Sequence, residues 1–453
     1  MKTFSIGVEN LGVIKNAQVE ASHLNIICGP NNSGKSFFLH SMYGFFKYGS
    51  SFVDIPVADE LVMSVRTTGK VLIADLTTYI NNVNNYIEKS LPAFVENLPS
   101  MLAKQKALFK DTKLKVQVAP AYLKMMTQGD RSSDFEVTEN CRCSYKKVGN
   151  SLEIILVNTG QEFPAEHLIR VVIGFVIQYV LTWFFHYIPV YLITSERTGT
   201  AMYEKLIRLP QDNEQKPNFQ KKENILSRCH LDELKLVSSF GQIAKDQSLL
   251  VSRNDRDNHS KRALQLLQKI VSGKYEWNET VGVRFKPNDT QIELDMTEVS
   301  SSIRALLSLD MMLSHSLYHP NTILLIDEPE LNLTPENQRL LARLLVQLVQ
   351  IGVGVSITTH SDYLVREVNT LIALSRKTTQ TLKIAEQFGY APEEMIDPDK
   401  VALYYIKKPS EVMPGENAFE KINFNGDFSV EIPPFDDSIA QMNEIQAKLS
   451  WEE

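Results

Sequence analysis

Short apolar runs separated by polar turns dominate the chain. Residues 24–28 (LNIIC), 322–326 (TILLI) and 352–361 (GVGVSITTHS) are apolar or β-branched over the length of a strand. Such runs are typical of parallel strands that are buried on both faces. Residues 35–46 (KSFFLHSMYGFF) have helical length and an apolar majority. The pattern predicts an α/β protein built around a parallel sheet.

The stretches between these runs follow other patterns. Residues 75–112 look helical but contain Pro92 and Pro99, which we expect to break the helix. They lack sustained heptads, so a long coiled-coil arm is excluded. Segments within 113–158 alternate or are β-branched and predict an antiparallel β-patch. Residues 208–224 are polar and contain proline, which predicts a loop.

Three features bear on where the protein resides. The N-terminus has no apolar signal region. Residues 171–185 form an apolar stretch of fifteen residues, short of the roughly 20 that cross a bilayer, and Pro189 follows. We interpret it as a core helix followed by a buried strand, with a membrane span as the alternative. The cysteines lack zinc-site spacing and suit a reducing cytoplasm: Cys28, Cys141, Cys143 and Cys229.

The chain has 453 residues, enough for two domains or for one domain with large insertions. Its overall charge is mildly acidic. A net charge of −7 argues against coating nucleic acid through bulk charge, although a local basic groove stays possible. Basic residues within 252–277 alternate with acids, which favours a solvated helix face over a basic surface: Arg253, Arg256, Lys261 and Arg262.

Residues 29–36 fit the phosphate-loop pattern G-x-x-x-x-G-K-[ST]. They are Gly29, Pro30, Asn31, Asn32, Ser33, Gly34, Lys35 and Ser36. Glycines let backbone N–H groups approach phosphate oxygens, Lys35 can reach the terminal phosphates, and the Ser36 hydroxyl can ligate Mg²⁺. A predicted strand precedes the loop and a predicted helix follows, so the helix N-terminus would point at the phosphates. The pattern predicts an ATP site.

The run at 322–326 ends in two acids, as a nucleotide site requires. Asp327 suits Mg²⁺ coordination at the carboxyl end of a strand, and Glu328 suits a general base that activates water. Neither is needed as a helix cap, because Thr334 and Pro335 begin the next helix. His360 ends the following strand, where a γ-phosphate sensor would lie; a structural histidine is the alternative.

The order of these motifs resembles the ABC-type ATPases of the SMC/RecF/OLD group. Lys35 and Asp327 stand 292 positions apart, so a large insertion interrupts one nucleotide-binding sheet. The resemblance rests on GPNNSGKS, IDEPELNLTPENQ and TTHS and covers roughly residues 1–46 and 190–369. It implies a P-loop ABC-type ATPase fold with a mixed or antiparallel β-patch and helical insertions.

This resemblance also implies a division of the chain. The expected ATPase core is discontinuous and consists of residues 1–48, about 113–200 and 285–385. A helical insertion at 49–112, a helical lobe at 201–284 and a C-terminal extension at 386–453 make up the rest. The tail from about residue 375 is on the small side for a nuclease domain of its own.

The group further needs a signature segment that acts on the nucleotide of a partner chain. The transporter form LSGGQ is absent, but Ser300, Ser301 and Ser302 precede an amphipathic helix at the matching place. An ordinary helix cap is the alternative. Arg197 in SERTG matches another segment of the group and could contact nucleotide or brace the site; a surface ion pair is equally open. Leu333-Thr334-Pro335 departs from the group's LHP, so no histidine role is expected there.

The resemblance implies a homo-oligomeric ATPase that uses ATP and Mg²⁺. Two chains, or pairs within a larger ring, would sandwich ATP between the phosphate loop of one and the serines of the other. The motifs are similar to those of ATPase subunits of bacterial anti-phage defence systems such as PARIS and Septu, which act with a separate effector such as a nuclease. The alternative is a RecF-like repair ATPase that clamps double-stranded DNA. A transporter motor is disfavoured because LSGGQ is missing.

Overall fold

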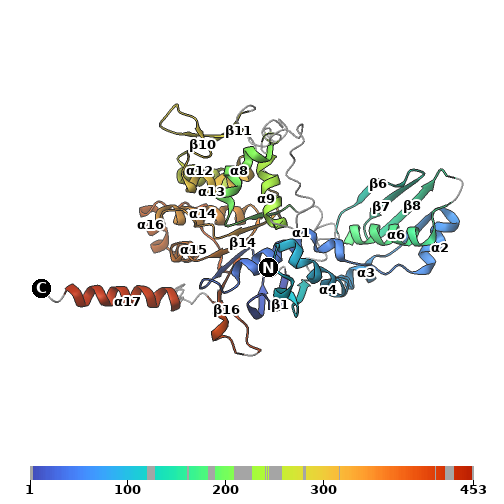
Figure 1. Cartoon of the computed structure of the whole chain (residues 1–453), viewed down its shortest axis with the longest axis horizontal. Helices are drawn as coiled ribbons and strands as arrows, with labels where there is room; N and C mark the ends of the chain where they lie inside the picture. Colours follow the sequence, from blue (N-terminus) through green and yellow to red (C-terminus); the bar gives the residue numbers. More distant parts are fainter. Residues whose placement is uncertain are drawn as a thin grey trace.

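A computed structural model of the chain describes most of its residues (Figure 1). The described ranges are 4–119, 128–160, 163–181, 189–208, 227–239, 241, 243, 258–278, 282–315, 317–413, 415–423 and 433–450. The predicted loop from residue 209 onward lies outside these ranges, as do Arg253 and Arg256 and residues 182–185 of the apolar stretch.

A six-stranded sheet forms the centre of the fold. Its order is β16 (Phe419–Ile422), β15 (Val401–Ile406), β3 (Leu24–Cys28), β14 (Gly354–Thr359), β13 (Ile323–Asp327) and β9 (Val190–Ile193). All neighbours pair in parallel except β16, which is antiparallel to β15. The strands predicted from the apolar runs are present, and the predicted α/β class, with the predicted loop between β3 and the helix that begins at Lys35, is confirmed.

Helices pack on both faces of this sheet. Alternate residues of β13 join different cores, because Leu325 faces one cluster while Leu324 and Ile326 face the other. The first cluster includes α1 (Lys35–Tyr48), and the second is built from α12 (Asn258–Val271), α13 (Ser301–Ser314), α14 (Pro335–Gln350) and α15 (Asp362–Leu374). Burial on both faces explains why these strands read as continuous apolar runs.

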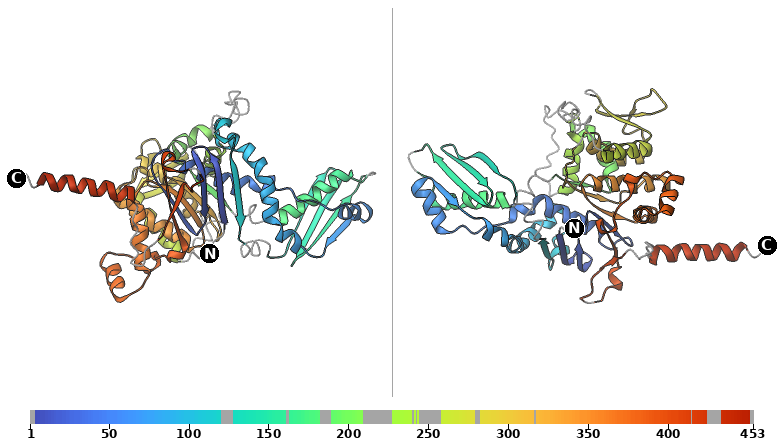
Figure 2. Two further views of the ribbon diagram at one scale, coloured as in Figure 1. Left: turned by 90° about the horizontal axis from the view of Figure 1, so that it is seen from below. Right: turned by 180° about the vertical axis from the view of Figure 1, so that it is seen from behind.

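The predicted antiparallel β-patch consists of two separate sheets. β5 (Lys113–Val118) pairs with β1 (Phe4–Leu11), which pairs with β2 (Ile14–Glu20). A second sheet has the order β4 (Lys70–Ile73), β8 (Ser151–Asn158), β7 (Cys141–Val148) and β6 (Arg131–Thr138). The second sheet lies at the far side of α4 (Val83–Leu102) from the central sheet, with α6 (Glu166–Leu181) against it and α2 (Asp59–Thr68) beside α6 (Figures 1 and 2).

The split has a physical reason. Val116 and Val118 of β5 face the core beside α4, whereas Cys143 and Tyr145 of β7 face a helix of their own, α6. Residues 131–158 therefore form a sheet apart from the central one, although the sequence assigns them to the ATPase core. A strand from the predicted helical insertion joins them. The domain boundaries themselves stay predictions.

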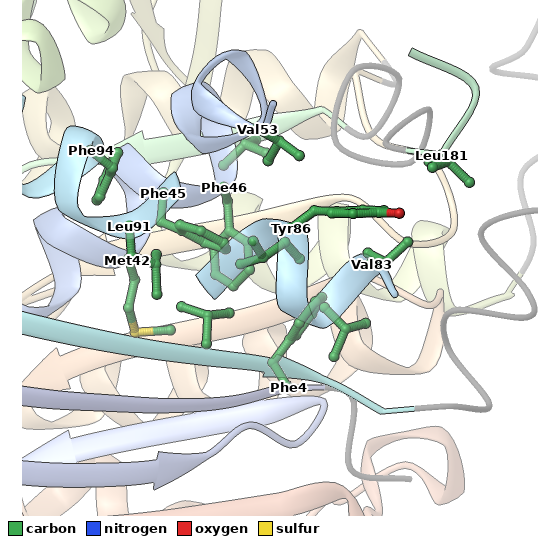
Figure 3. Close-up of a cluster of buried hydrophobic side chains, with 14 of the residues drawn as sticks. Phe4, Met42, Phe45, Phe46, Val53, Val83, Tyr86, Leu91, Phe94 and Leu181 are labelled. Atoms are coloured by element: carbon green, nitrogen blue, oxygen red, sulfur yellow. The ribbon is translucent and has the colours of Figure 1, made fainter. Parts of the chain in front are cut away.

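The expected helix break at Pro92 and Pro99 is wrong. α4 (Val83–Leu102) continues through both prolines. Its buried face includes Leu91, Phe94 and Leu98, and the Phe94 ring lies 5.8 Å from that of Phe45 on α1. Figure 3 shows this cluster between the two helices. Each interior proline costs about 3 kcal/mol, whereas each large buried side chain contributes about 1.5–3 kcal/mol, so burial of the whole face outweighs the two prolines.

The apolar stretch at 171–185 belongs mainly to α6. This helix buries seven residues, among them Ile173, Val176 and Ile177, and β9 follows it as the predicted strand. Within the described ranges, no helix has both the length and the apolar character that crossing a membrane demands.

The remaining elements complete the fold. A small antiparallel sheet has the order β10 (Gly273–Asn278), β11 (Gly282–Pro287) and β12 (Leu294–Asp295). Further helices in the described part of the chain are α3 (Thr77–Asn81), α8 (Arg197–Arg208), α9 (Arg228–Ser238), α16 (Thr379–Gln387) and α17 (Pro433–Ser450). Short 3₁₀ turns are η1 (Gly49–Phe52), η2 (Lys106–Phe109), η3 (Pro392–Glu394), η4 (Pro398–Lys400) and η5 (Pro409–Glu411). α17 projects away from the body in all three views (Figures 1 and 2).

Candidate nucleotide-binding site

The phosphate loop, residues 29–36, connects β3 to α1 in a conformation that requires its glycines. Gly29 has φ +148° and Gly34 has φ +100°. A Cβ on Gly29 would lie 2.5 Å from the Ile406 side chain, and one on Gly34 would lie 2.6 Å from Ile14. Both positions therefore exclude side chains by backbone conformation and by space. The loop has the strand before it and the helix after it that the sequence predicts.

Lys35 folds over the loop that precedes it. Its Nζ donates to the carbonyl oxygens of Pro30 at 2.8 Å and of Gly29 at 3.1 Å. Burial lowers the pKa of Lys35, while the nearby Glu328 and Asp327 carboxylates act in the opposite direction. The ammonium group is thus held at the concave side of the loop, beside the acidic residues at the end of β13.

Ser36 and Asp327 meet where the loop approaches the carboxyl end of β13. Ser36 Oγ donates to Asp327 Oδ1 at 3.0 Å, and the Thr358 hydroxyl donates to the same oxygen. Burial alone would raise the pKa of Asp327, but His40, Thr358 and Ser36 together hold it below its ordinary value. His40 Nε2 lies 3.3 Å from Asp327 Oδ2.

The donor set suits a magnesium ion. Asp327 Oδ2 is buried and faces His40 Nε2 at 3.3 Å, but it accepts no hydrogen bond of good geometry from the described residues. A carboxylate oxygen with spare acceptor capacity, beside a serine hydroxyl, is the arrangement that Mg²⁺ binds together with phosphate oxygens. Ser36 and Asp327 therefore fit the predicted metal ligands.

Glu328 and His360 lie side by side at the ends of β13 and β14. His360 Nε2 is 3.5 Å from Glu328 Oε1, and both side chains are about a quarter to a third exposed. Glu328 adopts φ +49°, which is uncommon for a residue with a side chain. Its N–H donates to the carbonyl and the hydroxyl of Thr358, which fixes the backbone there. The Glu328 and His360 side chains are thus partly accessible from solvent, and the ends of β13 and β14 fix their positions.

Glu330 is a site residue that the sequence prediction missed. It is buried, and its Oε1 accepts a hydrogen bond from the His360 N–H at 2.6 Å. Burial raises the pKa of Glu330, while the His360 N–H opposes that shift. The contact ties the backbone of His360 to the acidic segment 327–330. The signal was present in the sequence as the second glutamate of DEPE.

Arg197 braces the acidic segment. It is 3% exposed, which excludes a surface ion pair. Its guanidinium donates to five backbone carbonyls, those of Thr194, Ala305, Asp327, Glu328 and Pro329. Since these bonds occupy the guanidinium, the structure favours bracing over the predicted contact with nucleotide. A buried arginine saturated by carbonyls holds several chain segments at once.

The predicted signature serines lie apart from the phosphate loop. Ser300 caps α13 by accepting from the Ile303 N–H, and its Oγ lies 2.7 Å from Ser302 Oγ. Ser300 is exposed, and Ser301 and Ser302 are half-buried. No contact among the described residues joins these serines to the phosphate loop of the same chain. The helix that they begin is tied to the site by the hydrogen bond from Arg197 to the Ala305 carbonyl.

Polar residues of α9 contact the elements that carry the site, namely α1 and the segment after β9. His230 Nε2 lies 3.1 Å from Glu196 Oε2, and Asp232 accepts from the hydroxyls of Tyr43 and Tyr48 on α1. Glu233 accepts from the Thr194 hydroxyl at 2.7 Å. Sequence reasoning had no signal for this layer, because nothing in residues 227–239 marks which strand α9 packs against.

Comparison with known proteins agrees with this geometry. The family model for the AAA ATPase domain matches residues 1–365. Among curated proteins, none matches the chain. A structure of an SMC head bound to the C-winged helix domain of ScpA is 11% identical, covering 80% of this chain and 91% of that one at a TM-score of 0.34. The SMC head domain from Thermotoga maritima is 10% identical, covering 93% and 100% at a TM-score of 0.31.

With TM-scores this low, the two solved structures carry no weight in assigning the family. The family match covers most of the chain, and it includes the phosphate loop, the acidic segment and His360. The chain therefore belongs to the AAA ATPase domain family.

Proposed function

We propose that this chain binds ATP with Mg²⁺ and hydrolyses it to ADP and phosphate. The observation that supports this best is the hydrogen bond between Ser36 and Asp327, which joins two motifs that stand 291 positions apart. The Lys35 ammonium group interacts with the Glu328 and Asp327 carboxylates, and Glu328 lies 3.5 Å from His360. Family membership supports nucleotide binding independently.

Each residue has a distinct role in this proposal. Lys35 neutralises phosphate charge, and backbone N–H groups of the loop cradle the phosphates. Ser36 and Asp327 hold Mg²⁺, which when bound neutralises charge on the phosphate oxygens. Glu328 accepts a proton from the attacking water, and His360 contacts the γ-phosphate. Arg197 and Glu330 position these groups without touching the nucleotide.

Loss of the phosphate-loop lysine is the direct test. We would compare ATP binding and phosphate release of the full chain with those of Lys35→Ala. Lys383→Ala, at an exposed position of α16, is the matched control. The variant should lose nucleotide binding while the control retains it. Wild-type binding and turnover in Lys35→Ala would refute the site assignment.

The active form in this proposal is an ATP sandwich of two chains, alone or within a larger ring. Ser300, Ser301 and Ser302 of one chain then face the phosphate loop of the other. Their place at the N-terminus of α13, away from the loop of their own chain, supports an action in trans. Serine hydroxyls and helix N–H groups together bind anions well.

The cellular role we propose is anti-phage defence, with ATP-dependent assembly holding or releasing a separate effector such as a nuclease. It rests on the resemblance of the motifs to ATPase subunits of such systems. The alternative remains a RecF-like ATPase on double-stranded DNA, against which the net charge of −7 counts mildly.

Purification of a trapped complex separates the two roles. Tagged Glu328→Gln would be purified from its native cells with Mg²⁺ and ATP, with and without nuclease treatment. Mass spectrometry then identifies what co-purifies in near-stoichiometric amount. A discrete protein that survives nuclease treatment supports the effector role. DNA fragments without a protein partner favour the repair clamp.

A further inference from the structure

A surface groove lies between α4, η2 and β5. Its volume is about 790 Å³, within the range of about 300–1,000 Å³ over which pockets hold ligands or anchoring side chains. Apolar groups line it, namely Leu91, Pro92, Val95, Pro99, Phe109 and Leu114; Leu91, Pro99 and Phe109 are buried in the core beneath it, and Pro92, Val95 and Leu114 expose more of their surface. The groove is far from the acidic segment in sequence and shares no lining residue with the nucleotide site.

The rim of this groove is basic. Lys106, Lys110, Lys113 and Lys115 line it against only two acids, Glu88 and Glu96. Lys113 and Lys115 contact Glu9, yet their side chains are 71% and 73% exposed. An apolar floor under an excess of lysines suits an amphipathic segment with acidic residues.

The two prolines of α4 lie in the groove lining. A proline has no N–H, so residues 92 and 99 cannot bond the carbonyls four positions earlier, those of Glu88 and Val95. Both of these residues also line the groove. The prolines therefore deprive these two carbonyls of their usual helical donor.

α17 matches the groove in chemistry. Every described side chain from Ala440 to Leu449 is exposed. Met442, Ile445 and Leu449 are 61%, 51% and 65% exposed and follow the spacing of one helical face. From Pro433 to the last residue, the sequence contains five acidic residues and one lysine, and that lysine, Lys448, pairs with Glu444 at 2.6 Å, which leaves four acids without this partner. The segment is thus apolar on one stripe and acidic in total.

A helix whose described side chains, residues 440–449, are all exposed is marginal in water on its own. The exposed stripe of α17 therefore calls for a surface that covers it. In Figure 1, α17 projects beyond one side of the central sheet, and α4 lies on the other side of that sheet. A groove on a second copy is consequently a more direct acceptor than the groove of the same chain.

We propose that α17 of one chain docks into the α4 groove of a second copy. Met442, Ile445 and Leu449 enter the apolar floor, and the acidic residues of the tail face the lysines of the rim. Two chains can exchange their tails reciprocally, which gives a closed twofold pair. This interface is independent of ATP and of the proposed sandwich, so it would link chains without nucleotide.

Cysteine crosslinking in the full chain tests the proposal. Val95→Cys, on a size-tagged chain, would be mixed with untagged Ile445→Cys in nucleotide-free buffer and oxidised. The four native cysteines are buried, which limits background. Glu96→Cys, at the exposed rim, is a second groove position that does not disturb the floor. Met413→Cys, at an exposed methionine outside the groove, is the matched control for Ile445→Cys.

The expected product is a mixed dimer of tagged and untagged chains, at least about fivefold above the Met413→Cys control. Lys106→Glu with Lys110→Glu on the groove chain should lower its yield severalfold, because the charge match is reversed. Three results would each overturn the proposal. They are equal yield with Met413→Cys, dimers of Ile445→Cys alone as the main product, and purely intrachain crosslinks when both cysteines are on one chain.

Discussion

Ser36 Oγ donates a hydrogen bond to Asp327 Oδ1 at 3.0 Å although the two residues stand 291 positions apart. The sheet explains this contact. β14 lies between β3 and β13 and pairs in parallel with both, so the loop after β3 and the acids after β13 emerge at one edge. The order in which the strands pair, and not their separation in the sequence, therefore brings the catalytic residues together at the carboxyl ends of the strands.

Glu328→Gln should bind ATP normally and lose turnover. The amide keeps the shape of the carboxylate but cannot accept a proton from water. General-base catalysis typically contributes about 10²–10⁴-fold, so phosphate release should fall by at least about 100-fold. Binding of a fluorescent ATP analogue and phosphate release would be measured in parallel. Glu386→Gln, at an exposed position of α16, is the control, and turnover at the wild-type rate in Glu328→Gln would show that another group is the base.

Much of this site could be predicted because its motifs are local. The residue types and spacing of 29–36 follow from the backbone geometry that phosphate binding imposes. The cap at Thr334, which accepts from the Asn337 N–H, is also a local interaction. The His360 partner of Glu330 is 30 positions away, and four of the five carbonyl partners of Arg197 are more than 100 positions away. The sequence therefore left two roles open for Arg197 and offered none for Glu330.

The features that could not be predicted depend on which elements pack or pair with one another in the folded chain. His40 follows Ser36 by four positions on α1, so helical spacing places it on the same face, yet only the position of Asp327 gives it a role. The prolines of α4 looked like breaks because local propensity ignores the core beneath Leu91 and Phe94. The sequences of β5 and β6 both predict antiparallel strands. They join different sheets because β5 pairs with β1 whereas β6 pairs with β7.

Arg197→Lys should destabilise the protein and slow hydrolysis. A lysine has three donors on one nitrogen and cannot reach five carbonyls spread around a planar guanidinium. Buried acceptors left unpaired cost about 1–3 kcal/mol each, so the free energy of unfolding should fall by at least about 2 kcal/mol. Urea unfolding and phosphate release would measure the two effects. Arg66→Lys, with a side chain 56% exposed, is the control, and a stability equal to wild type would argue against bracing.

Ser301→Arg should abolish hydrolysis without abolishing ATP binding. In the proposed sandwich, a bulky cation at the N-terminus of α13 blocks the anion-binding end that faces the partner's nucleotide. Gln380→Arg, on exposed α16, adds the same side chain elsewhere as a control.

Mixing two inactive variants distinguishes action in trans from action in cis. A pair of Lys35→Ala and Ser301→Arg chains contains one site with an intact loop and an intact serine cap. Hydrolysis should therefore return on mixing if the serines act on the partner. If mixing restores nothing while both variants still associate, the serines do not act in trans.

Glu233→Gln should stabilise the protein at alkaline pH and have little effect at acidic pH. Burial raises the pKa of Glu233 to about 7, although hydrogen bonds from Thr194 oppose the shift. The ordinary value is 4.5, so between about 4.5 and 7 the folded state binds the proton that the unfolded state has released. Stability contributed by this group is then present below the unfolded pKa and is lost as pH rises through the folded value.

Thermal unfolding of wild type and Glu233→Gln at pH 5 and pH 8 measures this linkage. A neutral amide cannot ionise, so the variant escapes the loss and should melt higher than wild type at pH 8. Glu386→Gln provides a control at an exposed carboxyl. The Thr194 hydroxyl and N–H can still donate to the amide oxygen, so the geometry beside Arg197 is kept. An identical difference in melting temperature at both pH values would mean that Glu233 is ionised throughout, with Arg197 compensating its burial.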